Sequence, residues 1–211
     1  MLPKAVFLDK DGTLVENVPY NVDPEKIRLA AGAGAGLQAL HAAGFQLIVI
    51  TNQSGVAHGR FHEEDLWPVE ERIRQLLAGY GVPLSGFYFC PHHPDGIVRR
   101  YSKGCFCRKP SPGLLFKAAR EHNLNLAASW FIGDILNDVE AGRRGNCRTI
   151  LIDNGNETEW KLSPLRQPHY TVKDLFSAAE VILSREPEGV RVSESPSVPI
   201  KIDMNADLKI G

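Results

Sequence analysis

The chain has 211 residues and a formal net charge of −1, with 24 basic and 25 acidic residues spread along its length. A hydrophobic content of 43% and a charged content of 23% are typical of a globular protein with one sizeable core. The near-neutral balance argues against a nucleic-acid or membrane-surface partner, because no basic excess is present to attract a polyanion. Any anionic ligand is therefore expected to be held by a local site.

The amino-terminal residues predict a cytoplasmic protein. Met1–Lys4 leads directly into an apolar run, which leaves no room for a signal peptide. No apolar stretch of the sequence reaches the roughly 18 residues that are needed to cross a bilayer. We therefore expect a cytoplasmic monomer without a membrane partner.

The first half of the chain alternates short apolar runs with amphipathic segments. The run Ala5–Leu8 ends at an Asp-Lys-Asp-Gly turn and is typical of a short buried strand. A helix is expected over 35–43, before a strand over 45–50 that is apolar enough to be covered on both faces. A helix over 63–78, with apolar residues on one face, leads to a third strand over 87–89.

The second half continues this alternation after a polar loop over 90–110. Ser111 is expected to cap the next helix with Pro112 at its first position, since proline has no N–H to leave unsatisfied there. Alternating strands and helices predict an α/β fold, a Rossmann-like doubly wound parallel sheet with no large cap domain. The remaining elements are a helix end near His122, a strand over 130–132, a helix to Arg144, a fifth strand over 149–152 and a last helix over 172–183.

One domain is expected over residues 1–184, followed by a tail over 185–211. The tail is rich in Glu, Pro, Ser and Val without a helical period, which favours disorder. Weak alternation over 198–204 leaves an added edge strand as the alternative.

Four polar clusters follow the predicted strands or precede the predicted helices. Each alone also fits a solvated turn or a helix cap. Because ligands of open parallel sheets bind at the carboxyl ends of the strands, such a sheet would bring all four clusters to one edge. Their order therefore favours one shared site, made by Asp9/Asp11, Thr51–Ser54, Arg108-Lys109 and Asp134 with Asp138.

Over about residues 5–184 these motifs resemble the haloacid dehalogenase-like phosphohydrolases. Asp9-Lys10-Asp11-Gly12-Thr13 looks like the first family motif, Thr51 the second, Lys109 the third, and Gly133-Asp134 with Asp138 the fourth. The resemblance implies a phosphoric monoester hydrolase that works through an aspartyl-phosphate. Lys10 stands where the family usually has Arg, at a position that we expect to face solvent.

The chemistry of these residues fits such a reaction. The Asp9 carboxylate can attack phosphorus, which divides one displacement into two easier steps. Asp11 can protonate the leaving alcohol and later activate water. Thr51 and Lys109 can bind phosphoryl oxygens where negative charge spreads in the transition state. These four residues form the predicted catalytic set.

A divalent cation is expected beside Asp9, since a carboxylate and a phosphate repel each other. Oxygen ligands and a phosphate substrate favour Mg²⁺. The resemblance implies that Asp9, the Asp11 carbonyl and Asp134 are its ligands. Asp138 is left open between a place behind these ligands and a charge in the first turn of its helix.

A second constellation has the pattern C-x-H, twelve residues, C-x-C. It consists of Cys90, His92, Cys105 and Cys107. Soft and borderline ligands of this kind hold Zn²⁺ tetrahedrally, and clustered cysteines in a reducing compartment favour metal over disulfides. Free thiols are the alternative, and His93 could replace His92.

A closed four-ligand zinc site is a structural one, because it leaves no position for water or substrate. We expect it to pin the loop 90–110 and to position Arg108 and Lys109 directly after it. Cys147 is expected to be an ordinary core or loop thiol.

The zinc loop narrows the resemblance to the subfamily that removes the 7-phosphate of a heptose 1,7-bisphosphate in lipopolysaccharide heptose synthesis. Histidinol-phosphate phosphatases share this loop and are the alternative; a polynucleotide 3′-phosphatase and an inactive scaffold are weaker ones. Arg108 would hold the second phosphate, a task that suits a planar guanidinium. The segment 17–20 lacks the His-Gly that usually precedes the Tyr, which leaves sugar recognition open. The predicted contacts to a small phosphorylated sugar are Asn17, Tyr20, Thr51, Asn52, Gln53, Ser54, Arg108 and Lys109.

Overall fold

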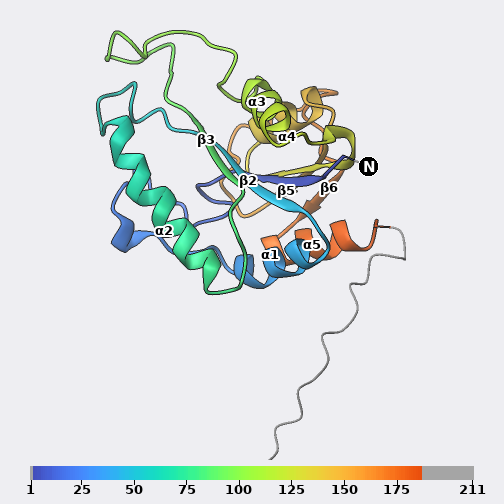
Figure 1. The fold of residues 1–211 in the computed structure, drawn as a ribbon. Coiled ribbons are helices and arrows are strands. Elements are labelled where there is room, and N and C mark those ends of the chain that lie inside the picture. The colour runs from blue at the N-terminus through green and yellow to red at the C-terminus, as the bar shows by residue number, and fades with distance from the viewer. Residues whose placement is uncertain (1, 187–211) are drawn as a thin grey trace, which may run out of the picture.

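A six-stranded parallel sheet forms the centre of the computed structural model, which describes residues 2–186 (Figure 1). Its strand order is β3-β2-β1-β4-β5-β6, and every neighbouring pair is parallel. The predicted α/β fold with a Rossmann-like parallel sheet is thereby confirmed. The strands are β1 (Ala5–Leu8), β2 (Gln46–Asn52), β3 (Gly86–Cys90), β4 (Trp130–Gly133), β5 (Arg148–Ile152) and β6 (Tyr170–Val172).

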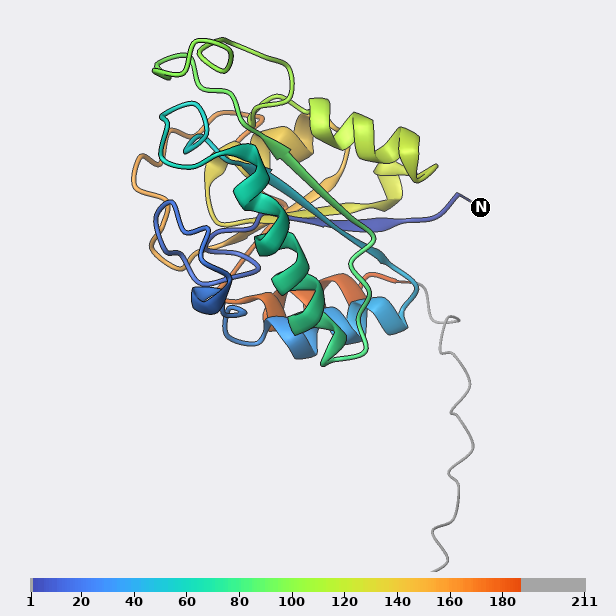
Figure 2. The same cartoon turned by 60° about the vertical axis from the view of Figure 1, so that its left-hand side comes forward.

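Helices cover both faces of this sheet. Helices α1 and α5 lie side by side on one face, with α2 toward the β3 edge, whereas α3 and α4 cover the opposite face (Figures 1 and 2). Within residues 2–186, none of the helices combines the length and the apolar character that crossing a membrane requires. The helices are α1 (Ala33–Ala42), α2 (Leu66–Ala78), α3 (Gly113–Glu121), α4 (Leu136–Arg144) and α5 (Leu175–Leu183), with 3₁₀ turns at Pro24–Lys26, Glu63–Asp65 and Leu126–Ala128.

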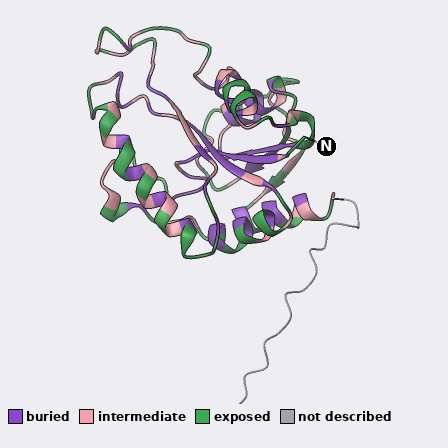
Figure 3. Ribbon diagram, in the orientation of Figure 1, coloured by how far each residue is buried: buried purple, intermediate pink, exposed green. Residues whose placement is uncertain are grey.

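The core consists of two layers that share the strands. Val6 and Leu8 of β1 pack toward α1 and α5, and Ala5 and Phe7 pack toward α3 and α4. Because successive side chains alternate between the faces, a strand covered on both sides must be apolar at every position. The central strands are accordingly buried throughout (Figure 3). This rigid sheet fixes the polar residues that follow each strand.

The carboxyl-terminal part differs from the prediction. Tyr170–Val172 is a sixth strand, paired with β5, and the last helix begins at Leu175 instead of Val172. Asp174 caps that helix by accepting a hydrogen bond from the Ser177 N–H at 2.7 Å. A three-residue, partly buried strand gives too little alternation to be distinguished from the start of a helix.

The start of α3 also corrects the prediction. The helix begins at Gly113, Pro112 occupies the capping position, and Ser111 gives no side-chain cap. The Ser111 N–H instead donates to the Arg108 carbonyl at 2.8 Å, within a turn that leads out of the preceding loop. The predicted tail from 185 and the alternative strand over 198–204 lie outside the described residues, apart from the first two positions of the tail.

Candidate active site and metal centre

The four predicted polar clusters meet at the carboxyl edge of the sheet. Asp9 follows β1 directly, Thr51 lies in the last part of β2, and Asp134 follows β4. Gly12 makes the turn after β1 with φ +84°, and a Cβ there would lie 2.1 Å from a carboxylate oxygen of Asp134. Only glycine allows the turn to approach Asp134 so closely. Lys109 reaches the same edge from the loop between β3 and α3.

Lys109 is the cation at the centre of this edge. Its buried ammonium contacts Asp9, lies 2.6 Å from Asp138 Oδ1, and donates to the Ile50 carbonyl at 3.0 Å. Burial alone would lower the pKa of Lys109, but the charges of Asp138 and Asp9 outweigh it and raise the pKa. The side chain is therefore held as an ammonium ion.

Three buried carboxylates surround this single ammonium. Asp9, Asp134 and Asp138 each place an oxygen within 4.8 Å of the others. Burial raises the pKa of Asp9 well above its usual value even though Lys109 opposes the rise. Burial and the charge of Asp138 raise the pKa of Asp134 to about 7. A buried excess of carboxylate oxygens fits a hard divalent cation, which would stabilise the ionised forms.

The structure places Asp138 in the first turn of its helix and beside Lys109. It lies in the first turn of α4, where one carboxylate oxygen accepts a hydrogen bond from the Ile135 N–H at 3.3 Å. Its other oxygen forms the ion pair with Lys109 at 2.6 Å. The residue is fully buried and so acts on the hollow described below through its neighbours.

Asp11 is held at the border of the site by two neighbours. Gln53 donates from Nε2 to Asp11 Oδ2 and also to Thr51 Oγ1, both at 3.0 Å. Lys10 pairs with the other oxygen of Asp11. Contrary to our expectation, Lys10 does not face solvent: it is 1% exposed, with its aliphatic stem enclosed and its ammonium turned to Asp11.

Two adjoining hollows open on this edge and share Asp11, Asn17 and Asn52. The first, of about 220 Å³, is lined by Asp9, Asp11, Asn17, Thr51, Asn52, Lys109, Asp134, Ile135 and Asn156. The second, of about 280 Å³, is lined by Asp11, Asn17–Asn21 and Asn52–Gly55. The predicted contacts Tyr20, Gln53 and Ser54 all fall in the second hollow.

Two predicted substrate residues do not simply point into these hollows. The Asn52 side chain makes two hydrogen bonds to the backbone of Lys109: it accepts from the N–H at 3.0 Å and donates to the carbonyl at 3.1 Å. Arg108 lines neither hollow; within the described chain its guanidinium donates to the His92 carbonyl at 3.3 Å. Asn52 therefore positions Lys109, and Arg108 is directed toward the cysteine-rich loop.

The loop after β5 contributes residues that the sequence did not reveal. Asn156 donates to Asp134 Oδ2 at 2.7 Å and accepts from Asn17 at 3.2 Å, while Asn154 donates to the Gly12 carbonyl at 2.7 Å. Asn-Gly-Asn is typical of any exposed turn, so nothing in the sequence distinguishes this loop. Its place beside Asp134 becomes visible only in the folded chain.

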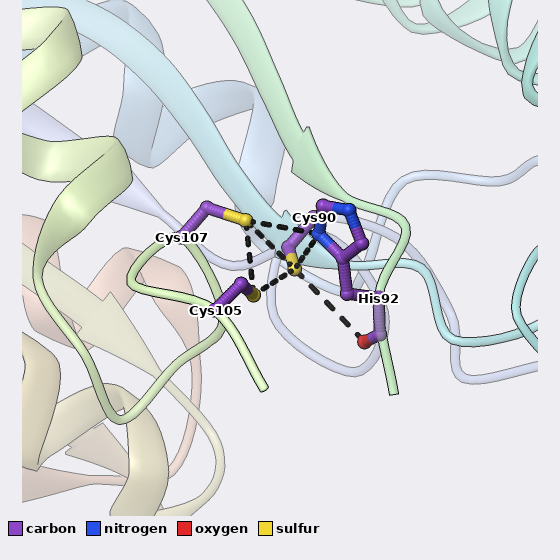
Figure 4. Close-up of side chains that lie close together, drawn as sticks. All are labelled: Cys90, His92, Cys105 and Cys107. Carbon is purple, nitrogen blue, oxygen red and sulfur yellow. Dashed lines mark hydrogen bonds between the residues drawn. The ribbon is translucent and has the colours of Figure 1, made fainter. Parts of the chain in front are cut away.

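Cys90, His92, Cys105 and Cys107 converge at the end of β3 (Figure 4). The sulfur–sulfur distances are 3.2 to 3.5 Å, and His92 Nδ1 lies 3.3 Å from Cys107 Sγ and 3.7 Å from Cys90 Sγ. Tetrahedral zinc with Zn–S bonds of about 2.3 Å separates its ligands by roughly 3.5–3.8 Å, so the group needs only a small expansion.

The remaining donors near this cluster are placed elsewhere. His93, the alternative to His92, accepts a hydrogen bond from the Asp95 N–H at 3.2 Å, and its ring lies 4.8 Å from that of His58. Cys147 is buried before β5, as expected of an ordinary thiol. The hydrogen bond between Cys107 and Cys90 lowers the pKa of Cys107 to about 5, whereas the same contact together with burial raises the pKa of the Cys90 thiol.

The fold and the carboxylate edge define a HAD-like hydrolase, and the chain belongs to this family. The family model described as HAD-hydrolase-like matches residues 106–178. Curated relatives between 35% and 41% identical extend the match to 72% of this chain or more and to at least 81% of their own length. The predicted family and the class of phosphoric monoester hydrolase are thereby confirmed.

Within the family, several of the similar proteins are heptose phosphatases. The D-glycero-β-D-manno-heptose-1,7-bisphosphate 7-phosphatase of Yersinia pestis is 41% identical over 152 residues, 72% of this chain and 81% of that protein. The α-heptose enzyme of Photorhabdus laumondii is 36% identical, over 74% and 85% respectively. The D,D-heptose 1,7-bisphosphate phosphatase of B. bronchiseptica, solved with magnesium and phosphate, is 27% identical with a TM-score of 0.71, covering 87% of this chain and 99% of that one.

Proposed function

We propose that the chain removes the 7-phosphate of D-glycero-D-manno-heptose 1,7-bisphosphate through an aspartyl-phosphate on Asp9. The observation that carries this proposal is the buried Asp9 beside Lys109, at the wall of a hollow whose border holds Asp11. The substrate follows from the relatives named above, to which the chain is similar over most of its length.

Asp9 is the nucleophile in this scheme. Lys109 stabilises its ionised form against the effect of burial and neutralises charge on the phosphoryl oxygens. The Asp9 oxygen bonds to phosphorus while the bond to the sugar oxygen breaks, and the Thr51 hydroxyl binds a phosphoryl oxygen. Mg²⁺ held by Asp9, Asp134 and the Asp11 carbonyl would supply the remaining positive charge.

Asp11 transfers the protons. It gives a proton to the leaving sugar oxygen, and it then takes a proton from the water that cleaves the aspartyl-phosphate, so that Asp9 and Asp11 both return to their initial states. Gln53 and Lys10 each hold one oxygen of Asp11, which fixes the rotation of its carboxyl group. The amide of Gln53 also aligns Thr51 with this proton carrier.

Zn²⁺ bound by the Cys/His cluster would take no part in the chemistry and would only position Lys109. Cys107 stands two residues before Lys109, so fixing the cluster fixes the point from which Lys109 enters the site. Arg108 would bind the 1-phosphate after exchanging the His92 carbonyl for phosphate oxygens at the second hollow, beside Asn52 and Ser54.

A substrate comparison tests this proposal. We expect kcat/KM for the 1,7-bisphosphates, measured as separate α and β anomers, to exceed that for histidinol phosphate by about 10²-fold, since the second phosphate adds a charged contact. The kcat/KM for heptose 7-phosphate should lie between these two values. In R108Q, kcat/KM should be the same for heptose 7-phosphate and the 1,7-bisphosphate. A preference for histidinol phosphate or a DNA 3′-phosphate would reject the substrate, and failure to hydrolyse any phosphomonoester with Mg²⁺ would reject the activity.

We further propose that the enzyme acts as a cytoplasmic monomer. Within residues 2–186 the whole predicted site is built from one chain, with no second copy needed to complete it. Sedimentation at assay concentration should give a single species of about 23 kDa. A dimer whose dissociation abolishes turnover would contradict this part of the proposal.

A further inference from the structure

A third hollow lies at the opposite, amino-terminal edge of the sheet. It measures about 330 Å³ and is lined by Ala127, Arg143, Asn146, Cys147, Arg148, Leu165 and His169. Arg148 is the first residue of β5, and His169 directly precedes β6. The five residues of β5 span roughly 15 Å, so the catalytic edge lies a full strand length away.

The two arginines in this hollow have no acidic counterpart in the described chain. Neither Arg143 nor Arg148 forms an ion pair within residues 2–186, and no acidic side chain is among the lining residues. The adjacent Arg144 and Arg166, in contrast, both pair with Glu140 at 2.7 Å. Two positive charges therefore converge on one concave surface without compensation.

The ring of His169 adds a second, independent sign of a missing acceptor. Its Nδ1 accepts a hydrogen bond from the Thr149 N–H at 2.9 Å, and its Nε2 lies 2.7 Å from Nη1 of Arg143. A neutral imidazole has one ring lone pair, whereas the amide and the guanidinium are both donors. In the Nε2–H tautomer the ring and Arg143 therefore face each other as two donors; in the Nδ1–H tautomer the Thr149 N–H faces a donor, while the Thr149 hydroxyl, 3.0 Å from Nδ1, can accept from it.

The surroundings hold these donors in place. The guanidinium of Arg148 lies over the Trp130 ring, 5.3 Å from its centroid, and His169 is fixed through its backbone and its ring to Thr149. Burial lowers the pKa of His169, and the charges of Arg143 and Arg148 lower it further, so both arginines act on the ring. Side chains fixed in this way lose little entropy when they bind a ligand.

We propose that this hollow is a second anion site that binds a phosphate group, either inorganic phosphate or the phosphate of a small monoester. An oxyanion between Arg143, Arg148 and His169 Nε2 would accept from all three donors and separate the two that now face each other. Guanidinium groups match phosphate oxygens in geometry as well as charge, and a volume of about 330 Å³ fits a small ligand. The site is independent of the proposed substrate.

Amide NMR of the full chain tests this site. Inorganic phosphate and glucose 1-phosphate are titrated separately without Mg²⁺, against chloride of equal ionic strength. We expect saturable shifts at Thr149 and His169, which lie on the edge opposite Asp9. In R143Q/R148Q the apparent Kd at these reporters should rise at least 10-fold, and in the control R99Q/R120Q, which removes the same charge from exposed positions, it should not change. Both variants should retain wild-type turnover, because neither touches the catalytic edge.

The two probes separate the sources of the anion. Saturation by phosphate alone identifies the free ion, and tighter binding of the sugar phosphate identifies a monoester. Shifts that grow linearly with ionic strength, or equal effects of the two double variants, would overturn the proposal. Arg143 would then only complement the carboxyl end of α4.

Discussion

The carboxylate cluster, with three members, and the Cys/His cluster, with four, differ in what they face. Asp9, Asp134 and Asp138 lie around a single ammonium, and Asp9 and Asp134 line a hollow of about 220 Å³. The donors of the Cys/His cluster approach one another to between 3.2 and 3.7 Å, and four protein ligands would complete the coordination of a tetrahedral zinc. The open cluster is suited to chemistry on a substrate, and the closed cluster is suited to holding a loop.

Replacing Asp9 with Asn should have the largest effect on activity and almost none on the fold. We expect kcat/KM to fall at least about 10³-fold, because the nucleophile of a covalent mechanism is lost. The melting temperature should stay equal or rise, since burial disfavours the charge that is removed. Steady-state kinetics and thermal unfolding measure both. Asp153→Asn, which removes a surface carboxylate, should retain full activity.

Replacing Cys107 with Ser should instead reduce the stability of the fold. We expect zinc measured by elemental analysis to fall from one equivalent per chain to none, with a stability loss above about 4 kcal/mol, a range that loss of a metal can produce. Urea unfolding measures the second quantity. Cys147→Ala is the matched control, because its thiol lies outside the cluster. Zinc that persists in Cys107→Ser would separate this cysteine from the metal.

Lys109 follows the Cys/His cluster in sequence and contacts the carboxylate cluster. A double-mutant cycle with Asp138 separates its contribution to stability from its contribution to catalysis. Lys109→Met should cost about 3 kcal/mol of stability in Mg²⁺-free buffer, because buried carboxylates lose their cation. Adding Asp138→Asn should recover most of that stability but none of the activity, which needs the ammonium at the phosphate. If the double variant is no more stable than Lys109→Met, the ion pair is not what holds Lys109.

Replacing Glu140 should have the smallest effect on stability. This carboxylate forms ion pairs with two arginines, Arg144 and Arg166. Hydrogen bonds from Arg166 and Arg144 outweigh burial and lower its pKa below the usual value of 4.5. Its contribution to stability is therefore present above about pH 4.5 and is lost as the pH falls through the lowered pKa. Measured by urea unfolding, Glu140→Gln should cost about 1 kcal/mol at pH 7 and progressively less as the pH falls through the lowered pKa. Glu180→Gln, on an exposed face of α5, should show no such dependence.

The parts of the fold that could be predicted are those with a local cause. The strand Ala5–Leu8 was predicted at its observed bounds because burial on both faces makes it continuously apolar. The polar clusters could be assigned to one edge because parallel strands place their carboxyl ends together. The short β6, at Tyr170–Val172, has no comparable pattern: its first two residues carry no predicted element, and Val172 is predicted to begin the last helix.

The parts of the site that escaped prediction depend on contacts distant in sequence. Asn156 reaches Asp134 across 22 positions, and Asn154 reaches Gly12 across 142. Lys10 was expected to face solvent because lysine usually does, but the turn after β1 encloses its stem and directs its ammonium to Asp11. Arg108 donates to the His92 carbonyl, and that contact depends on how the loop folds back.

Chemical trapping of the intermediate tests the central claim most directly. The enzyme is mixed with Mg²⁺ and heptose 1,7-bisphosphate, quenched in acid within one turnover, and treated with borohydride, which reduces an acyl phosphate to an alcohol. Peptide mass spectrometry should find homoserine in place of Asp9, and only when substrate is present. Full turnover with an unmodified Asp9, or with the modification on Asp11 or Asp134, would contradict this account.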